Sequence, residues 1–201
     1  MRIRSYIILL AIALSVSISA QADIVVNGGF ETGFTGWAVT GGCMGVAASS
    51  PPGAGCIGAD PGTDPGYHSG GYAAYLGATP GTLSQTLATT AGSTYTLSYW
   101  LANDSVGGAD VPNSFSLSWD GAQIAASVLT DLAWGPYVQY TFSGLVASTA
   151  STPLVFSPSN TPADWVLDDV SVNAVPDGGM TIMLLGGALV GLETLRRRFR
   201  A

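Results

Sequence analysis

The chain has 201 residues, of which 47% are hydrophobic and 9% are charged, and its formal net charge is -7. All six basic residues lie near the two ends, and the stretch from Asp23 to Val175 contains acidic residues but no lysine or arginine. Phosphate backbones would repel this acidic body, which excludes nucleic-acid binding, and any carboxylate buried in it has no basic side chain as a partner.

The first 22 residues have the three parts of a secretory signal peptide. Two arginines open the segment, an apolar run follows over residues 6–14, and small residues stand at positions 20 and 22. We therefore predict a signal helix over residues 1–22 that is removed on export, which leaves a mature chain beginning near Asp23. The alternative is an uncleaved anchor, which would need a longer apolar stretch.

Residues 23–174 consist of short segments that alternate between apolar and polar residues, separated by Gly, Pro, Asn and Asp. Alternation with a period of two indicates strands, and no stretch keeps the 3.6-residue period of a helix. Asp120-Gly121 is typical of a hairpin turn, here leading to Ile124. We predict one all-β domain, an antiparallel β-sandwich or jelly roll. The predicted strands span residues 24–26, 37–40, 72–76, 82–87, 95–101, 114–119, 137–142, 154–156 and 165–172.

Cys43 and Cys56 are the only cysteines, and they flank a loop rich in Gly, Pro and Ser. In an exported chain an even pair of cysteines favours a disulfide, and a metal-binding or nucleophilic role lacks partner residues. Closing a loop of this size stabilises a fold by about 3 kcal/mol in the chain-entropy model. We predict that Cys43 and Cys56 are bonded.

Aromatic residues in loops are candidates for stacking on sugar rings. Trp134 and Tyr137 flank Gly135-Pro136, and Tyr67 stands in a Gly-rich loop beside His68, the only histidine. Core packing is the alternative role for each of them. The remaining tryptophans lie in or beside predicted strands and are expected to be structural: Trp37, Trp100, Trp119 and Trp165. No carboxylate pair stands out by its spacing, so we predict no catalytic residues and no enzyme activity.

Asp168 lies in the last predicted strand, where Val166, Val170 and Val172 share its face by the period of two. Three valines predict a buried face, with Asp168 pointing inward or lying at the margin of the core. Because the domain has no lysine or arginine, this carboxylate must be protonated, bonded to backbone N–H groups, or bound to a cation. A hard oxygen ligand of this kind suits Ca²⁺.

The two ends of the domain resemble the first and last strands of galactose-binding-like jelly rolls, the fold of many carbohydrate-binding modules. The resemblance lies in Asn27-Gly28-Gly29-Phe30-Glu31 with Gly36-Trp37, and in Trp165-Val166-Leu167-Asp168-Asp169-Val170-Ser171-Val172. Residues 83–87 and 92–100 fit the interior of the same pattern. In such modules a structural Ca²⁺ is commonly held near these strands, and the matching positions here are Glu31 and Asp168. The architecture hosts many functions, so the resemblance implies a fold before a ligand.

The last 27 residues combine a turn-forming stretch, a short apolar segment and a basic end. Positive residues stay in the cytoplasm, so the domain before this segment would face outward. A helix over residues 180–195 would be roughly 24 Å long against a hydrocarbon core of about 30 Å, which predicts a short transmembrane segment. The stretch and the basic end are Val175-Pro176-Asp177-Gly178-Gly179 and the cluster containing Arg196, Arg197 and Arg198.

This order over residues 175–201 resembles the bacterial PEP-CTERM sorting signal, and more closely its VPD-type variant (VPDSG-CTERM). Asp177 stands where the commonest motif has Glu. The resemblance implies recognition by an exosortase, an integral membrane processing enzyme, and transient anchoring before release to the cell envelope or the extracellular matrix. A simple membrane anchor is the alternative for the tail. For the domain we expect a structural or weak-binding role on the cell surface, and the alternative is a carbohydrate-binding module that recognises exopolysaccharide.

Overall fold

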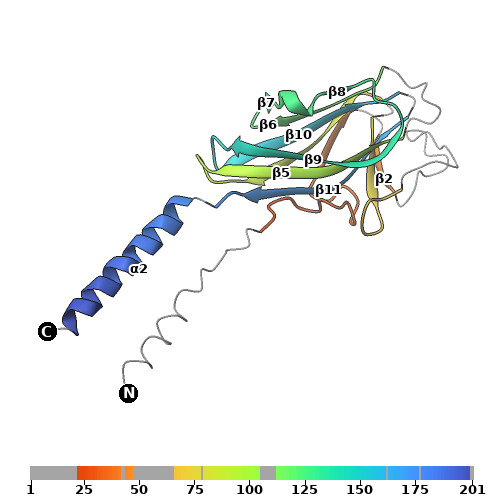
Figure 1. Cartoon of the computed structure of the whole chain (residues 1–201). Coiled ribbons are helices and arrows are strands. Elements are labelled where there is room, and N and C mark those ends of the chain that lie inside the picture. Colours follow the sequence, from red (N-terminus) through yellow and green to blue (C-terminus); the bar gives the residue numbers. More distant parts are fainter. Residues whose placement is uncertain are drawn as a thin grey trace.

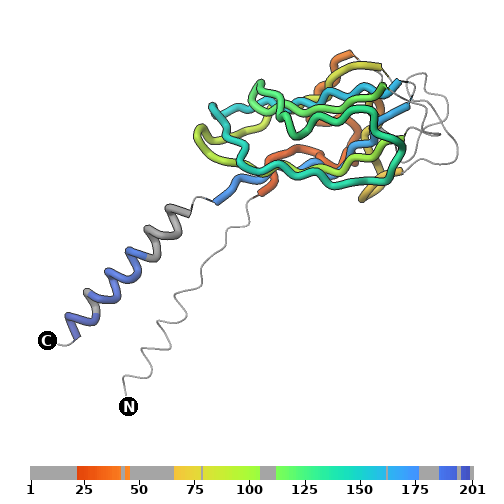
Figure 2. The backbone as a smooth tube through the Cα atoms, turned by 45° about the horizontal axis from the view of Figure 1, so that its top comes forward, coloured from red at the N-terminus to blue at the C-terminus, as the bar shows by residue number. Residues whose placement is uncertain are grey.

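The structure, a computed structural model, describes residues 22–41, 44–47, 66–77, 79–104, 112–161, 163–176 and 178–199. Within these residues the chain forms two antiparallel sheets that lie face to face, followed by one long helix (Figure 1). A second view shows the same two layers along their length (Figure 2). The prediction of an all-β antiparallel sandwich is confirmed.

Sheet A has six strands among the described residues, in the order β1-β4-β10-β6-β7, with β8 also paired to β6. Ser116 of β6 lies opposite Ser157 of β10 on the outer side of this sheet. The strands are β1 (Ala38–Gly41), β4 (Gly81–Ala88), β6 (Ser114–Trp119), β7 (Ala122–Gln123), β8 (Leu129–Thr130) and β10 (Ser151–Ser159).

Sheet B has five strands within the described ranges, in the order β2-β3-β11-β5-β9. The last strand in the sequence, β11, is central in this sheet, because it pairs with β3 on one side and β5 on the other. The strands are β2 (Met44–Ala47), β3 (Ala73–Leu76), β5 (Thr94–Asn103), β9 (Gly135–Val146) and β11 (Trp165–Ala174).

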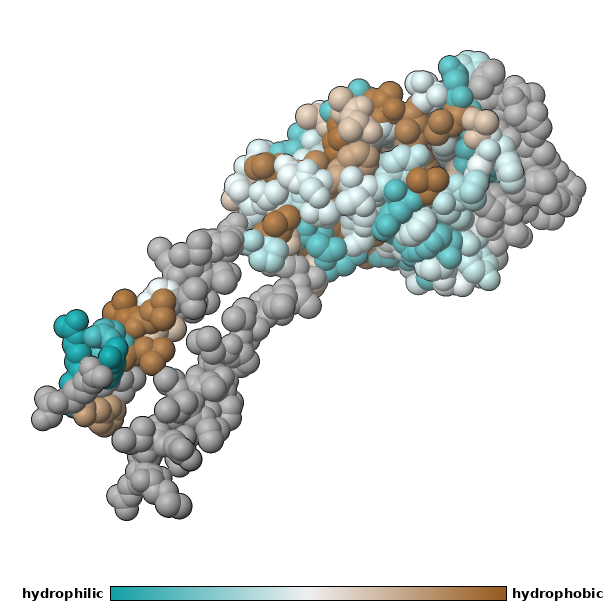
Figure 3. All heavy atoms as spheres, viewed as in Figure 1, coloured by the Kyte–Doolittle hydropathy of each residue, from teal (hydrophilic) through white to brown (hydrophobic). Residues whose placement is uncertain are grey.

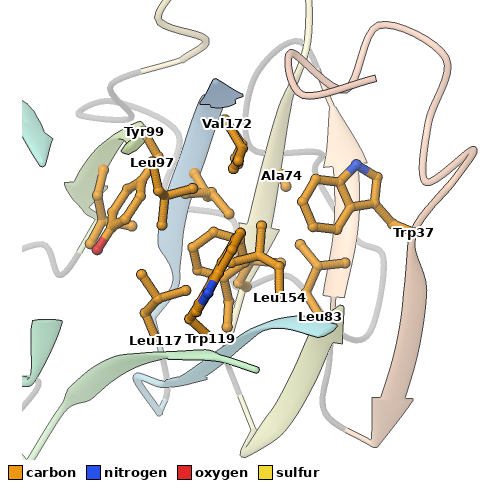
Figure 4. Packing of buried hydrophobic residues seen from close by; sticks show 14 of the residues in the cluster. Trp37, Ala74, Leu83, Leu97, Tyr99, Leu117, Trp119, Leu154 and Val172 are labelled. Carbon is orange, nitrogen blue, oxygen red and sulfur yellow. The ribbon is translucent and has the colours of Figure 1, made fainter. Parts of the chain in front are cut away.

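The core lies between the two sheets because apolar residues recur at every second position of the strands. In β5, for example, Leu97 and Tyr99 are fully buried, whereas Ser98 between them faces away from the core. Burying each large side chain contributes about 1.5–3 kcal/mol, so this layer is the main source of stability. Figure 4 shows Trp37, Leu83, Leu97, Tyr99, Leu117, Trp119, Leu154 and Val172 packed together.

Several strand predictions differ from the structure: β9 and β10 are longer than predicted, and the short strand β8 was not predicted. Residues 24–26 form no strand, because the buried Gln85 side chain takes the place of a neighbouring chain: its Oε1 accepts from the Val26 N–H (2.8 Å) and its Nε2 donates to the Val26 carbonyl (2.9 Å). Strand β2 was not predicted, since its sequence is short and rich in small residues. The predicted hairpin at Asp120-Gly121 is confirmed, with positive φ at both residues (53° and 80°) between β6 and β7.

The apolar segment after Pro176 forms helix α2 (Gly178–Arg198). Among the described residues, no helix combines the length and the apolarity that crossing a membrane requires. Three predictions fall wholly or partly outside the described residues: residues 1–21 of the signal peptide predicted over 1–22, the Cys43–Cys56 bond, and Asp177 of the sorting motif.

Candidate functional site

A β-bulge in β11 sets the geometry of the candidate site. The pairing of β11 with β5 shifts between Asp168 and Ser171, and Asp169 has a φ of 49°. The extra residue moves the alternation by one position, so Val170 and Val172 pack in the core while Val166 belongs to a second cluster outside it. The prediction that Asp168 shares a face with Val170 and Val172 is therefore wrong. Asp168 lies with Val166 on the outer side of sheet B.

Asp168 is 0% exposed because the loop formed by residues 66–72 lies over it. Its Oδ2 accepts from the N–H groups of His68 (2.8 Å) and Ser69 (3.1 Å), and its Oδ1 accepts from the N–H of Asp169 (2.7 Å). Of the three kinds of compensation that the sequence left open, backbone N–H groups are observed. Burial raises the pKa of Asp168 to about 6, although these three hydrogen bonds act in the opposite direction.

Two further carboxylates hold the same loop. Asp169 contacts His68 through Oδ2 and Nδ1 (2.6 Å) and accepts from the Ser69 hydroxyl through Oδ1 (2.7 Å). Oε1 of Glu31 accepts from the N–H groups of Gly71 (2.7 Å) and Tyr72 (3.1 Å). We call Glu31, Asp168 and Asp169 the carboxylate clamp. The clamp fixes a loop that is about 100 residues from β11 in sequence.

The fit between the clamp and the loop predicts unequal effects of two matched glycine substitutions. Gly70 and Gly33 both have positive φ (65° and 66°), so Ala would cost each backbone about 1–2 kcal/mol. A Cβ on Gly70 would also collide with the Glu31 carboxylate, whereas nothing lies within 4 Å of a Cβ on Gly33. Gly70→Ala should therefore lower the free energy of unfolding by about 1–3 kcal/mol more than Gly33→Ala in urea titrations. Equal losses would show that Glu31 does not constrain the loop.

An aromatic cluster adjoins the clamp on the outer side of sheet B. The His68 ring stacks on the Trp100 indole, with centroids 3.9 Å apart and an interplanar angle of 16°. Tyr137 meets His68 edge-on at 5.4 Å and donates from its hydroxyl to the Gly66 carbonyl (2.8 Å). Trp100 thus lies in a strand, as predicted, but on the outer side of sheet B and not in the core between the sheets. The sequence did indicate this, because in a strand Trp100 shares a face with Thr96 and Ser98, whereas Leu97 and Tyr99 lie on the opposite face.

Beyond the aromatic cluster, the outer side of sheet B carries a set of uncharged hydrogen-bonding side chains, which we call the polar face. Thr96 donates to Ser143 (3.4 Å) and Asn173 to Ser171 (2.8 Å) across this surface. Strand register and the Thr96–Ser143 bond place the members side by side: Thr96 and Ser98 on β5, Gln139, Thr141 and Ser143 on β9, and Ser171 and Asn173 on β11.

The residues predicted to stack on sugars have different environments. Tyr67 and Trp134 are 45% and 48% exposed. Tyr137 is half-buried and packs against the outer cluster of Ala73, Tyr75, Ala102 and Val166, so its ring supports the loop. Tyr67 lies in that loop and Trp134 just precedes β9, which keeps both available as contact residues.

The predicted calcium positions, Glu31 and Asp168, converge on Gly29. A Cβ built on Gly29 would lie 3.6 Å from Asp169 Oδ1, 3.8 Å from Asp168 Oδ1 and 4.0 Å from Glu31 Cγ. Two of these three atoms are carboxylate oxygens, the kind of ligand that Ca²⁺ prefers. Over the described ranges, no group of three or more His, Cys, Asp or Glu side chains is placed to hold a metal ion. A cation here would need backbone carbonyls or water to complete its ligands.

No protein-family model matches the sequence, and no curated protein is similar to it. Solved structures are similar. A family 61 carbohydrate-binding module in complex with β-1,4-galactotriose has a TM-score of 0.55 and 19% identity over 77% of this chain and 99% of that one. A carbohydrate-binding module of family 16 is also similar, with a TM-score of 0.51 and 16% identity over 74% of this chain and 98% of that one.

A further similar structure is the enzymatically active domain of tailspike protein 4 from bacteriophage CBA120. Its TM-score is 0.53 and its identity 12%, and the match covers 76% of this chain but 21% of the tailspike chain. At these identities the likeness concerns the fold. The chain has the same kind of β-sandwich as carbohydrate-binding modules.

Proposed function

We propose that the domain binds a polysaccharide along the polar face of sheet B. One observation carries this proposal: hydroxyl and amide side chains from three adjacent strands end at a stacked aromatic cluster that three carboxylates hold in place. Sugar rings are recognised by hydrogen bonds to their hydroxyl groups and by stacking of aromatic rings on their apolar faces. The alternative function predicted from the sequence thereby becomes our main proposal.

The class of ligand follows from charge and from the similar structures. The domain has no lysine or arginine to pair with uronate or sulfate groups, so the proposed ligand is a neutral glycan. One similar module was solved with β-1,4-galactotriose, which supports a β-1,4-galactan as the first probe.

The test is affinity electrophoresis in gels that contain neutral polysaccharides. Gln139→Ala/Thr141→Ala removes two side chains of the polar face, and Ser116→Ala/Ser157→Ala removes two facing hydroxyls from the outer side of sheet A. Losing two hydrogen bonds should weaken binding by about tenfold or more for the first variant, and the second should match the parent. No retardation of the parent by any polysaccharide would refute the proposal, as would an equal loss in both variants.

We also propose that the site is not catalytic. His68 has Nδ1 on Asp169 and its ring against Trp100, an arrangement that supports an anchoring role. Appearance of reducing ends when the protein is incubated with the polysaccharides it retains would contradict this, and their absence is the expected result.

We propose in addition that Glu31 and Asp168 hold a structural Ca²⁺. The support is that Asp168 Oδ1 and Asp169 Oδ1 lie beside Gly29, next to the Glu31 side chain, in a domain that has no lysine or arginine. Such an ion would neutralise the clamp and hold the loop, and it would take no part in chemistry.

Finally, we propose that the chain is exported and sorted by its tail through an exosortase-type enzyme. The support is the sequence of the two ends, residues 1–22 and 175–201. In the fold the Ile24 N–H donates to the Val172 carbonyl (3.0 Å), which places the start of the domain beside its end. Both terminal segments therefore join the sandwich at one end. Intact-mass measurement of the protein from its host should show removal of residues 1–22 and a cut near the Val175–Gly179 motif, and an unprocessed mass would contradict it.

A further inference from the structure

The two chain ends leave the sandwich at one end, which we call the exit pole (residues 89–93, 120–121, 146–151 and 174–176). Its loops are bonded to each other, with Thr89 N–H donating to the Ala150 carbonyl (3.1 Å) and Gly92 N–H to the Ala147 carbonyl (2.8 Å). Figure 2 shows the start and end of the sandwich adjacent at this pole. The opposite pole, near residue 133, is roughly 30 Å away, which is the length of a ten-residue strand such as β5.

The exit pole is closely tied to helix α2. The Val175 N–H donates to the Thr94 carbonyl (2.7 Å), so sheet pairing continues as far as Val175, and the helix begins at Gly178. The three Cα steps between them can span at most about 11 Å. Whatever contacts the start of α2 must therefore come close to the exit pole.

Helix α2 exposes a surface that suits lipid. Leu189 is 59% exposed and Val190 65%, and Phe199, directly after the helix, is 82% exposed. The basic residues Arg196, Arg197 and Arg198 follow the apolar stretch, and Figure 3 shows the apolar band beside the hydrophilic end. Apolar side chains next to a cluster of arginines fit an acyl region bounded by anionic headgroups.

The exit pole, as defined above, contains one carboxylate, Asp120, and Asp23 lies next to it. The rest of the pole is built mainly of Thr, Ser, Ala and Gly, and both carboxylates accept hydrogen bonds from the fold. Asp23 Oδ1 accepts from the N–H groups of Val25 and Val172 (both 2.9 Å), and Asp120 Oδ2 accepts from that of Ser148 (2.9 Å). Val146 and Val175 add exposed apolar surface (54% and 42%). Anionic headgroups repel carboxylates, so a domain held near such lipid should turn this pole toward the membrane and the other carboxylates of the domain away from it.

We propose that the exit pole lies against the bilayer surface, so that the strands stand roughly upright on the membrane. The inference rests on the membrane role proposed for α2. It has a consequence for the proposed ligand: the polar face of sheet B, which runs along the strands, would open sideways, parallel to the cell surface. A polysaccharide would then be held beside the domain and not between the domain and the membrane.

The experiment uses the full chain with a single fluorophore on an introduced cysteine. Ala91→Cys places it at the exit pole and Ala133→Cys at the opposite pole, and both alanines are exposed loop residues. The chain is mixed with vesicles of phosphatidylethanolamine and phosphatidylglycerol that contain a headgroup spin-labelled lipid, and bound chain is recovered by flotation. The parent chain gives the background labelling of Cys43 and Cys56. The label at residue 91 should lose most of its fluorescence, and that at residue 133 should be unchanged.

A linker variant separates the possible failures. A Gly/Ser linker of about 12 residues inserted after Pro176, with a root-mean-square length of roughly 20 Å, keeps sandwich and helix but frees one from the other. Flotation should persist while quenching at residue 91 falls. Flotation of the unmodified chain with equal quenching at both positions would overturn the upright orientation alone. Failure to float would overturn the membrane role of α2 and with it this inference, and neither result would bear on polysaccharide binding.

Discussion

Replacing Asp168 by alanine should lower the free energy of unfolding by about 4 kcal/mol and free the loop at residues 66–72. The carboxylate accepts from the N–H groups of His68, Ser69 and Asp169, and the Asp168 side chain is fully buried. Each buried donor left without a partner costs about 1–3 kcal/mol, so the loss exceeds that of an ordinary surface substitution.

Asp168→Asn and Asp120→Asn calibrate this prediction. The amide at position 168 keeps one acceptor oxygen and loses the other, so that variant should lose about half as much as the alanine variant. Asp120 is also a carboxylate that accepts a backbone N–H, but the group lies at an exposed turn, so its amide variant should lose much less stability than Asp168→Asn. Urea unfolding measures all three, and hydrogen exchange at the His68 and Ser69 amides reports the loop. Equal losses for the two Asn variants would show that Asp168 does not hold the loop.

Much of the fold was accessible from local pattern alone. The alternation in residues 95–101 and 114–119 predicted β5 and β6 because each strand has one face in the core and one outside. The turn at Asp120-Gly121 was predictable for a similarly local reason, since positive φ suits these residue types.

The site was less accessible because it depends on contacts between distant segments. The bulge at Asp169 reverses which residues of β11 face the core, and Val170 reaches its register through a hydrogen bond to Gly28, about 140 residues earlier. Nothing in the alternation of Val166, Asp168 and Val170 indicates such a break. Likewise, the placement of His68 on Trp100 follows from the clamp, whose members come from opposite ends of the domain.

The pH dependence of stability offers a direct test of the proposed Ca²⁺. A carboxyl in an unfolded chain has a pKa of about 3.9, and burial raises the pKa of Asp168 to about 6 in the folded protein. Between these values the folded state binds more protons than the unfolded state. Without divalent ions, the free energy of unfolding should therefore fall by up to about 3 kcal/mol as pH rises from 4 to 6, and then stay level with respect to this group.

Bound Ca²⁺ should reverse this slope, because the ion stabilises the ionised carboxylate only in the folded state. Urea unfolding in EGTA and in excess Ca²⁺ at a series of pH values gives the two curves, which should diverge as pH rises from 4 to 6 and remain apart above pH 6. The Asp168→Asn variant has no carboxyl at this position, so its stability should show neither the fall with pH in EGTA nor the reversed slope in Ca²⁺. Superimposed curves in EGTA and Ca²⁺ would reject the ion. A stability that rises with pH in EGTA would instead mean that the three backbone N–H bonds to Asp168 outweigh its burial.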